Sequence, residues 1–175
     1  MKSIILIGYM GAGKSTIGKI LAEKKQIPFF DTDIGIEEKQ GRKISEIFRQ
    51  EGEEYFRGLE TDMLEELKEQ KQKQVIATGG GLPMKVENQE LLKKIGVIFY
   101  LVVKKETILE RLREDKSRPL LMGEEKEKKI EEMLRIRDPI YQRLADFCIQ
   151  TDGKNIKTVV NEIEKSLEED TDFGR

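Results

Sequence analysis

The chain has 175 residues and a formal net charge of −2, with 37% hydrophobic and 38% charged residues. This length suffices for one domain with a proper core. The absence of a basic excess predicts no nucleic-acid partner, and no apolar run approaches the ~18 residues of a membrane span. Histidine is absent, which leaves proton chemistry to carboxylates or lysine.

The first predicted element is a strand that leads into a glycine-rich loop and a helix. Residues 3–7 form a short apolar run typical of a buried strand, and residues 17–23 predict an amphipathic helix. Between them, residues 8–16 fit the P-loop pattern G-x-x-x-x-G-K-[ST]. In such a loop Lys14 can reach the terminal phosphates and Ser15 can ligate Mg²⁺. The strand and helix context favours this interpretation over a chance glycine turn.

A pair of aspartates follows the second predicted strand. Residues 27–30 form an apolar run, and Asp31 and Asp33 come directly after it. In an extended chain this spacing places both carboxylates on the same side. One could hold Mg²⁺ through water while the other meets a substrate hydroxyl. The alternative is that Asp33 merely caps the next helix, but the nearby P-loop favours function.

Residues 34–71 predict two or three helices without a strand, which suggests a lobe over the site. One helical face in this region is apolar; it carries Phe56, Leu59, Met63, Leu64 and Leu67. Within the same helix Arg57 has Glu60 three residues further on, so the carboxylate could orient the guanidinium. The alternative is a surface ion pair, which stabilises little.

Three glycines follow the third predicted strand, at 75–78. The segment Gly79, Gly80 and Gly81 can expose backbone N–H groups and leave room for a ligand, although a flexible turn has the same composition. A fourth strand is predicted at 97–103. Phosphate ligands of parallel sheets bind at the carboxyl ends of strands, where the P-loop already lies.

Three further candidate arginines lie in the C-terminal part of the chain. Arg111 precedes an aperiodic segment at about 115–125, and there it either lies in solvent or stacks on a base. That segment is predicted to be a lid, in which Arg118 could close over the transferring phosphate as an internal arginine finger. Arg137 precedes Pro139, which we expect to end or kink the helix and leave Arg137 at an exposed turn.

The last predicted strand, at 146–150, contains the single cysteine, Cys148. We expect this side chain to pack in the core rather than to react. A single cysteine excludes an intramolecular disulfide and fits a reducing compartment. The chain also enters its first strand without a basic-then-apolar leader. The sequence therefore predicts a cytoplasmic protein.

The alternation of strands and helices predicts one α/β domain over 1–175 with a parallel sheet. Its core is expected to comprise 1–32, 72–114 and 126–168. Residues 33–71 are expected to form the helical substrate-binding region, and about 115–125 the lid. The tail, 169–175, is expected to fray.

The motifs together resemble those of the shikimate kinases. The P-loop, Phe-Phe-Asp-Thr-Asp at 29–33, Phe-Arg-x-x-Glu at 56–60, Thr-Gly-Gly-Gly at 78–81, Arg-Pro-Leu-Leu at 118–121 and Arg-Asp-Pro-Ile-Tyr at 137–141 occur in the family's order and spacing. The resemblance runs from about residue 2 to residue 165. The P-loop alone is common to many kinases, whereas the full set is far more specific.

The resemblance implies a three-layer P-loop kinase fold with a five-stranded parallel sheet flanked by helices, a helical substrate-binding insertion and a lid loop. It implies transfer of a phosphoryl group from ATP to the 3-hydroxyl of shikimate, in the chorismate route to aromatic amino acids. Mg²⁺ is the implied cofactor, and ATP and shikimate are the implied small-molecule partners. A monomer is expected.

The resemblance also implies residue roles. The implied ATP-binding residues are Gly11, Ala12, Gly13, Lys14, Ser15, Thr16, Arg111, Arg118 and Lys154. The implied shikimate-binding residues are Asp33, Arg57, Gly79, Gly80, Gly81 and Arg137. Lys14, Asp33 and Arg118 are implied to be catalytic, and Ser15 and Asp31 to hold the metal. Lys154 stands where some members of the family present arginine near the adenine.

Two other functions compete with this interpretation. A gluconate or nucleotide kinase would share the fold and the P-loop, but the two acceptor arginines and the Asp-x-Asp pair favour shikimate. A nucleotide-binding regulatory domain without turnover is the second alternative. A guanine-binding Asn-Lys-x-Asp is absent, and Lys14, Asp33 and the arginines of an active kinase are all present.

Overall fold

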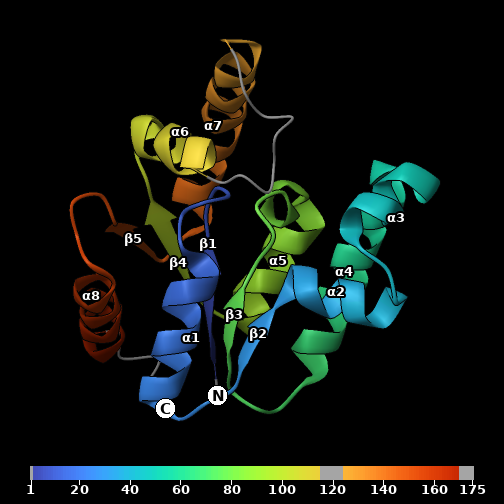
Figure 1. The fold of residues 1–175 in the computed structure, drawn as a ribbon. Coiled ribbons are helices and arrows are strands. Elements are labelled where there is room, and N and C mark those ends of the chain that lie inside the picture. Colours follow the sequence, from blue (N-terminus) through green and yellow to red (C-terminus); the bar gives the residue numbers. More distant parts are fainter. Residues whose placement is uncertain (1, 115–123, 170–175) are drawn as a thin grey trace.

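The computed structural model describes residues 2–114 and 124–169, and a parallel sheet of five strands lies at its centre (Figure 1). Its order is β2-β3-β1-β4-β5. The strands are β1 (Ser3–Ile7), β2 (Phe29–Asp31), β3 (Val75–Ala77), β4 (Gly96–Val102) and β5 (Phe147–Gln150). The α/β class and the five-stranded parallel sheet are confirmed.

Helices fill the connections between the strands. They are α1 (Lys14–Lys25), α2 (Thr32–Gln40), α3 (Ile44–Glu51), α4 (Glu53–Glu69), α5 (Val86–Ile95), α6 (Lys105–Glu114), α7 (Glu124–Leu144) and α8 (Ile156–Glu169), with a 3₁₀ turn η1 (Leu82–Met84). The helical insertion predicted at 34–71 is confirmed as α2, α3 and α4.

Hydrophobic side chains cover both faces of the sheet. Successive residues of a strand point to opposite faces, so Ile4 and Leu6 of β1 pack with α1, α6 and α8 while Ile5 and Ile7 pack with α2, α4 and α5. Figure 1 shows α1 and α8 on one side of the sheet and α4 and α5 on the other. Burial on both faces explains why β1 is a continuous apolar run rather than an alternating one.

The apolar face of α4 is present where the sequence predicts it. Phe56, Met63, Leu64 and Leu67 are buried, and Leu59 packs against them. Thr61 on α4 donates a hydrogen bond to Asn88 Oδ1 (2.9 Å), and Asn88 donates to the Leu82 carbonyl (2.9 Å). Helix α4 is thereby fixed to the turn that follows β3.

The expectation that Cys148 packs in the core is wrong. Cys148 is exposed, whereas the neighbouring Ile149 is buried. The reason is the position of β5 at the edge of the sheet, where it pairs with β4 alone. An edge strand is covered less completely than a central one, so one side of β5 stays open to solvent.

The site position follows from the strand order. From β1 the chain crosses to β2 on one side and later reaches β4 on the other. Leu6 is in register with Ala77, so the loops that follow β1 and β3 leave the sheet side by side. Ligands of such sheets bind at the carboxyl edge near this change of direction.

Candidate active site

The P-loop presents unpaired donors to an anion. Gly11 and Gly13 have φ angles of 77° and 88°, a left-handed conformation that costs glycine little. No side chain caps α1. Because the first N–H groups of a helix have no partner within it, this end offers donors and partial positive charge to phosphate.

Lys14 is the first residue of α1, directly after the glycines of the loop. Its ammonium donates to the carbonyls of Gly8 (2.8 Å) and Tyr9 (2.9 Å). Burial lowers its pKa to about 8, an effect that Asp33 and Asp31 oppose. A buried ammonium with only carbonyl partners gains much from an anion.

A pocket of about 290 Å³ joins the P-loop to the glycine segment. Its lining is Met10, Gly11, Gly13, Lys14, Ser15, Thr16, Asp31, Asp33, Thr78, Gly79 and Gly80. The structure thus brings together the P-loop, both aspartates and two of the three glycines, although three different stretches of the chain supply them.

The extended geometry expected for Asp31 and Asp33 is wrong. Strand β2 ends at Asp31 and α2 begins at Thr32. Asp31, not Asp33, is the N-cap; its Oδ1 accepts from the N–H groups of Asp33 (3.0 Å) and Ile34 (3.3 Å). Capping by a short carboxylate satisfies orphan donors and favours an early helix start. Both carboxylates nevertheless line the same pocket.

The second oxygen of Asp31 faces the P-loop. Ser15 donates from its hydroxyl to Asp31 Oδ2 (2.7 Å). A hydroxyl and a carboxylate are hard oxygen donors, which Mg²⁺ prefers when it also binds phosphates and water. The two residues therefore fit a magnesium ion.

Asp33 is a partly buried carboxylate that lines the pocket. Burial raises its pKa, and the charge of Asp31 raises it further, while Lys14 lowers it. A carboxyl with a raised pKa accepts a proton more readily than an exposed aspartate does. Its position at the first turn of α2 points this group at the glycine segment.

The glycine segment is tightly surrounded by charged side chains. A Cβ added at Gly79 would lie 2.6 Å from Asp33 Oδ1, and one at Gly81 would lie 2.5 Å from both terminal nitrogens of Arg57. At Gly80 the added carbon would lie 3.2 Å from Arg137 Nη1. The segment is therefore more than a flexible turn, because it is the floor that three predicted acceptor-binding side chains approach.

Arg57 is held by a buried carboxylate. Its Nη1 donates to Glu60 Oε2 (2.7 Å), and the Glu60 side chain is only 1% exposed. Burial raises the pKa of Glu60, whereas the Arg57 charge lowers it. A second bond runs to the exposed Glu53 (3.2 Å). Arg57 is thus oriented by a buried pair rather than the alternative surface pair.

The exposed turn expected around Arg137 is wrong. Helix α7 runs from Glu124 to Leu144 with Pro139 inside it, and Arg137 is half-buried. An interior proline costs about 3 kcal/mol. The helix continues because its neighbours are anchored: Tyr100 donates to Asp138 Oδ1 (2.5 Å), and Tyr141 is completely buried.

Arg111 and Lys154 lie beside a second, smaller pocket of about 160 Å³, behind the P-loop. Arg111 donates to the Gly11 carbonyl, and Lys154 pairs with Glu162 at 2.7 Å. Ala12, Gly13 and Thr16 line the same pocket. Arg118 and most of the predicted lid, 115–123, lie outside the described residues; Glu124 and Glu125 already belong to α7.

Three side chains at the site are missed by sequence reasoning. Thr32 accepts a hydrogen bond from the Gly79 N–H (2.9 Å), and the Tyr9 ring lies 5.7 Å from Arg137 Cζ. The hydroxyl of Tyr141 donates to the Gly80 carbonyl (2.5 Å). All three residues stand inside motifs quoted above, and this was the signal available in the sequence.

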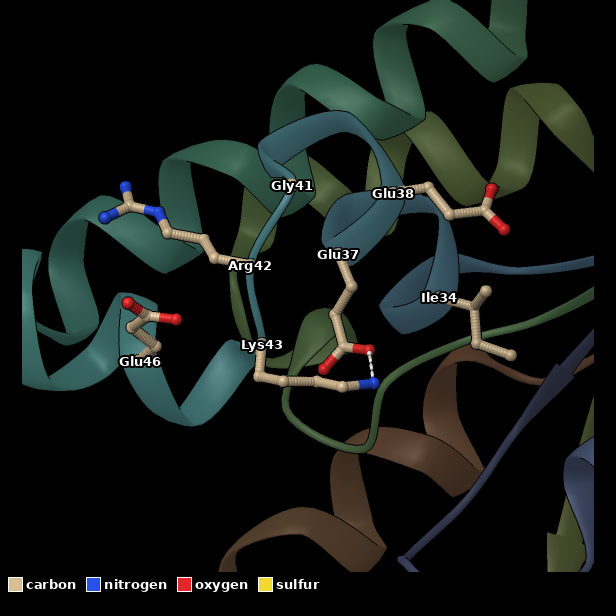
Figure 2. Close-up of a pocket in the computed structure, with 7 residues that line it drawn as sticks. All are labelled: Ile34, Glu37, Glu38, Gly41, Arg42, Lys43 and Glu46. Atoms are coloured by element: carbon tan, nitrogen blue, oxygen red, sulfur yellow. Dashed lines mark hydrogen bonds and ion pairs between the residues drawn. The ribbon is translucent and has the colours of Figure 1, made fainter.

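A larger hollow than the P-loop pocket lies elsewhere among the described residues. An open depression of about 630 Å³ lies between α2 and α3, lined by Ile34, Glu37, Glu38, Gly41, Arg42, Lys43 and Glu46 (Figure 2). Glu37 pairs with Lys43 (3.0 Å) and accepts from the Ile44 N–H (3.0 Å). Figure 2 shows Arg42 and Glu38 pointing away from each other. Charges that satisfy one another do not converge on a ligand, so the smaller P-loop pocket is the candidate site.

Comparisons with known proteins agree with the motif set. The family model for shikimate kinase matches residues 10–168. A shikimate kinase of Thermodesulfovibrio yellowstonii is 46% identical, over 96% of this chain and 96% of that protein. One of Thioalkalivibrio sulfidiphilus is 47% identical, over 93% of this chain and 85% of that protein. No helix in the described part of the chain has the length and apolar character to cross a bilayer.

Solved structures extend the similarity to the fold. A shikimate kinase from Acinetobacter baumannii in complex with shikimate has a TM-score of 0.89 and 40% identity, covering 98% of this chain and 95% of that chain. One from Aquifex aeolicus has a TM-score of 0.83 and 38% identity, covering 95% and 96%. The fold is therefore that of a P-loop kinase, and the chain belongs to the shikimate kinase family, whose members phosphorylate shikimate with ATP.

Proposed function

We propose that the chain transfers the γ-phosphoryl group of ATP to the 3-hydroxyl of shikimate in the pocket between the P-loop and the glycine segment. One observation carries the assignment of the site. Asp33, Arg57 and Arg137 reach Gly79, Gly81 and Gly80 respectively from three different helices. Cations suit a carboxylate and an aspartate suits hydroxyls, so this arrangement matches an acceptor that carries both.

The acceptor is held by side chains and backbone together. Arg57 and Arg137 bind the carboxylate, because a guanidinium offers paired donors in one plane. Asp33 accepts from the hydroxyls, and the segment of Gly79, Gly80 and Gly81 allows the acceptor to approach closely. The Acinetobacter relative was solved in complex with shikimate, which supports the choice of acceptor.

The phosphates of ATP bind at the start of α1. Lys14 lies among the donors of the loop and stabilises the charge that develops during transfer. Arg118, from the segment outside the described residues, is proposed to act at the same phosphoryl group. The proposed ATP contacts are Gly11, Ala12, Gly13, Lys14, Ser15, Thr16, Arg111, Arg118 and Lys154.

Ser15 and Asp31 would hold Mg²⁺, for which their oxygens fit. The bound ion supplies charge neutralisation at the phosphates. In the described structure the Ser15–Asp31 bond already places the two groups 2.7 Å apart. The aspartate keeps its orientation because its other oxygen caps α2.

In the proposed step the oxygen of the 3-hydroxyl forms a bond to the γ-phosphorus as the bond to the β-bridging oxygen breaks. ADP leaves, and the hydroxyl proton passes to Asp33 or, where Asp33 only orients the hydroxyl, to solvent. The raised pKa of Asp33 supports the first route. Phosphoryl transfer depends mainly on positioning and charge neutralisation, so a chain without histidine can perform it.

We further propose a cytoplasmic monomer. The support for the compartment is the single cysteine, which fits a reducing environment. Sedimentation of the purified protein with and without ATP tests the monomer; a dimer at micromolar concentration would contradict it.

The decisive experiment measures ADP release from ATP and Mg²⁺ with shikimate, gluconate, a nucleoside monophosphate or water as the acceptor. Release with shikimate alone is the expected result. Release with gluconate or a nucleotide would overturn the roles given to Asp33, Arg57 and Arg137. ATP binding without release would favour a regulatory nucleotide-binding domain.

A further inference from the structure

Tyr141 is a completely buried tyrosine within Arg-Asp-Pro-Ile-Tyr, and the function above gives it no role. It stands on α7 one turn after Arg137, so the two side chains share a helix face. Its hydroxyl donates a hydrogen bond to the carbonyl of Gly80 at 2.5 Å. Helix α7 therefore carries both Arg137, a proposed acceptor-binding residue, and Tyr141, which contacts the backbone of the glycine segment.

The same hydroxyl also meets Arg137. The positive charge of the guanidinium lies close enough to Tyr141 to lower the pKa of its hydroxyl, against the larger effect of burial. The closeness of the three groups is independently visible at Gly80, where an added Cβ would lie 3.2 Å from Arg137 Nη1. On its other side the guanidinium lies over the Tyr9 ring.

The direction of these hydrogen bonds is fixed by chemistry. Tyr141 donates to the Gly80 carbonyl. A guanidinium can only donate, so a hydroxyl that lies between the two groups accepts from Arg137. Burial raises the pKa of Tyr141 to about 12. The hydroxyl therefore keeps its proton at any pH at which the protein would be assayed.

We propose that Tyr141 is a positioning residue for the acceptor: its hydroxyl bridges the Arg137 guanidinium and the Gly80 backbone and holds them at a set separation. The inference rests on the proposed function, because it takes Arg137 and Gly80 as contacts of shikimate. Tyr141 itself touches neither substrate. A fixed guanidinium loses less freedom when the carboxylate binds, so the bridge strengthens binding of the acceptor.

The test is Tyr141→Phe, which removes the hydroxyl and keeps the ring. We expect the KM for shikimate to rise by about tenfold or more, as for loss of a hydrogen bond to a charged group. The KM for ATP should change by less than about twofold, because no P-loop contact is lost. Binding of shikimate measured by calorimetry should weaken by the same factor.

Tyr100→Phe is the matched control. It removes another buried tyrosine hydroxyl that is bonded to α7, through Asp138 (2.5 Å), and its ring lies 5.0 Å from that of Tyr141. It should lower the melting temperature and leave the KM for shikimate within about twofold, because its hydroxyl contacts neither Arg137 nor Gly80. An equal rise in both variants would show loss of helix stability and overturn the bridge.

Arg137→Ala separates the two hypotheses. If it leaves the KM for shikimate unchanged, the proposed site is wrong and the inference is overturned with it. If it raises that KM while Tyr141→Phe does not, only the bridge is overturned. If both raise it, the effect of Tyr141→Phe should shrink in the Arg137→Ala background, because the hydroxyl acts partly through that guanidinium.

A measurement on the unaltered protein covers the case in which Tyr141→Phe does not fold. A buried, doubly bonded hydroxyl proton exchanges slowly enough to be seen by NMR. Its resonance should shift when shikimate is added and stay in place with ADP alone. A resonance that ignores shikimate would overturn the inference.

Discussion

The P-loop end of the pocket takes its geometry from one continuous stretch, residues 8–16, whereas the acceptor end is assembled from α2, α4, α7 and the segment after β3. At the first end, backbone N–H groups and the helix dipole are proposed to do most of the binding, together with a few side chains. At the second, side chains that are distant in sequence converge on three glycines. Substitutions that shift packing should therefore damage acceptor binding while leaving ATP binding nearly intact.

The largest effect expected from this comparison concerns Asp33. Asp33→Asn should lower kcat by about 10³-fold, because the amide cannot take a proton and holds a hydroxyl less well than a carboxylate. ATP affinity should stay close to that of the unaltered protein. A steady-state assay together with ATP titration checks both. A large loss of ATP binding would place Asp33 at the phosphate end and contradict the division of the pocket into an ATP end and an acceptor end.

Arg118→Ala is expected to come next. If Arg118 acts as an internal arginine finger, kcat should fall by about 10²-fold or more. The KM for shikimate should change much less. Single-turnover kinetics of phosphoryl transfer measure this directly. A change confined to that KM would instead assign Arg118 to ground-state binding of the acceptor.

Gly81→Ala tests the glycine floor. Gly81 has a φ of −85°, which alanine adopts freely, so the only new feature is a methyl group 2.5 Å from the Arg57 nitrogens. Arg57 must move, and we expect the KM for shikimate to rise by about tenfold to 100-fold, the range for a lost charged hydrogen bond. ATP binding should not change.

Gly58→Ala is the matched control for this prediction. It stands next to Arg57 on α4, and an added Cβ meets nothing within 4 Å. Alanine is also the better helix former by about 0.5–1 kcal/mol. The variant should be as stable as the original protein or more so, with unchanged kinetics. Impaired acceptor binding in Gly58→Ala would contradict the steric explanation.

The smallest effect is a pH dependence at Glu60. Its pKa lies above the ordinary 4.5 because of burial. As pH falls through that raised value Glu60 becomes neutral, its bond to Arg57 weakens, and the KM for shikimate should rise. Glu60→Gln should raise this KM severalfold at neutral pH and flatten its acidic rise. Initial rates between pH 5 and 8 measure both effects.

Glu53→Gln provides the comparison for Glu60. Glu53 also bonds Arg57 (3.2 Å), but its side chain is 68% exposed. An exposed i,i+4 pair on a helix contributes about 0.3–0.5 kcal/mol, so this variant should change the KM by less than about threefold. Equal effects of the two variants would mean that burial of Glu60 does not orient Arg57.

The contrast between the continuous P-loop and the assembled acceptor end also explains which features could be predicted from the sequence. The P-loop and the five strands can be recognised from local sequence patterns. The structure confirms the five strands and the helix that follows the P-loop. Asp31 and Asp33 were expected at the right place with the wrong geometry, because nothing in the spacing tells which aspartate caps α2. The predicted roles of the site residues stay predictions.

Residues whose placement depends on long-range packing were the hardest to predict. Pro139 was expected to break the helix, but the buried contacts of Asp138 and Tyr141 outweigh the local penalty. Cys148 was expected inside because a free cysteine in a strand usually packs as a small core residue. Its position at the sheet edge depends on strand order, which the sequence pattern alone does not specify.

The position of Lys14 has a consequence for how the two substrates influence each other. Burial is the main cause that lowers the pKa of Lys14 to about 8, and the charge of Arg137 adds a smaller effect in the same direction. An acceptor carboxylate that neutralises Arg137 would therefore increase the protonated fraction of Lys14 and tighten phosphate binding. Thermodynamic linkage requires ATP to strengthen acceptor binding by the same factor. The ATP end and the acceptor end of the pocket would thus be coupled by one free energy, through the electrostatic repulsion between Lys14 and Arg137.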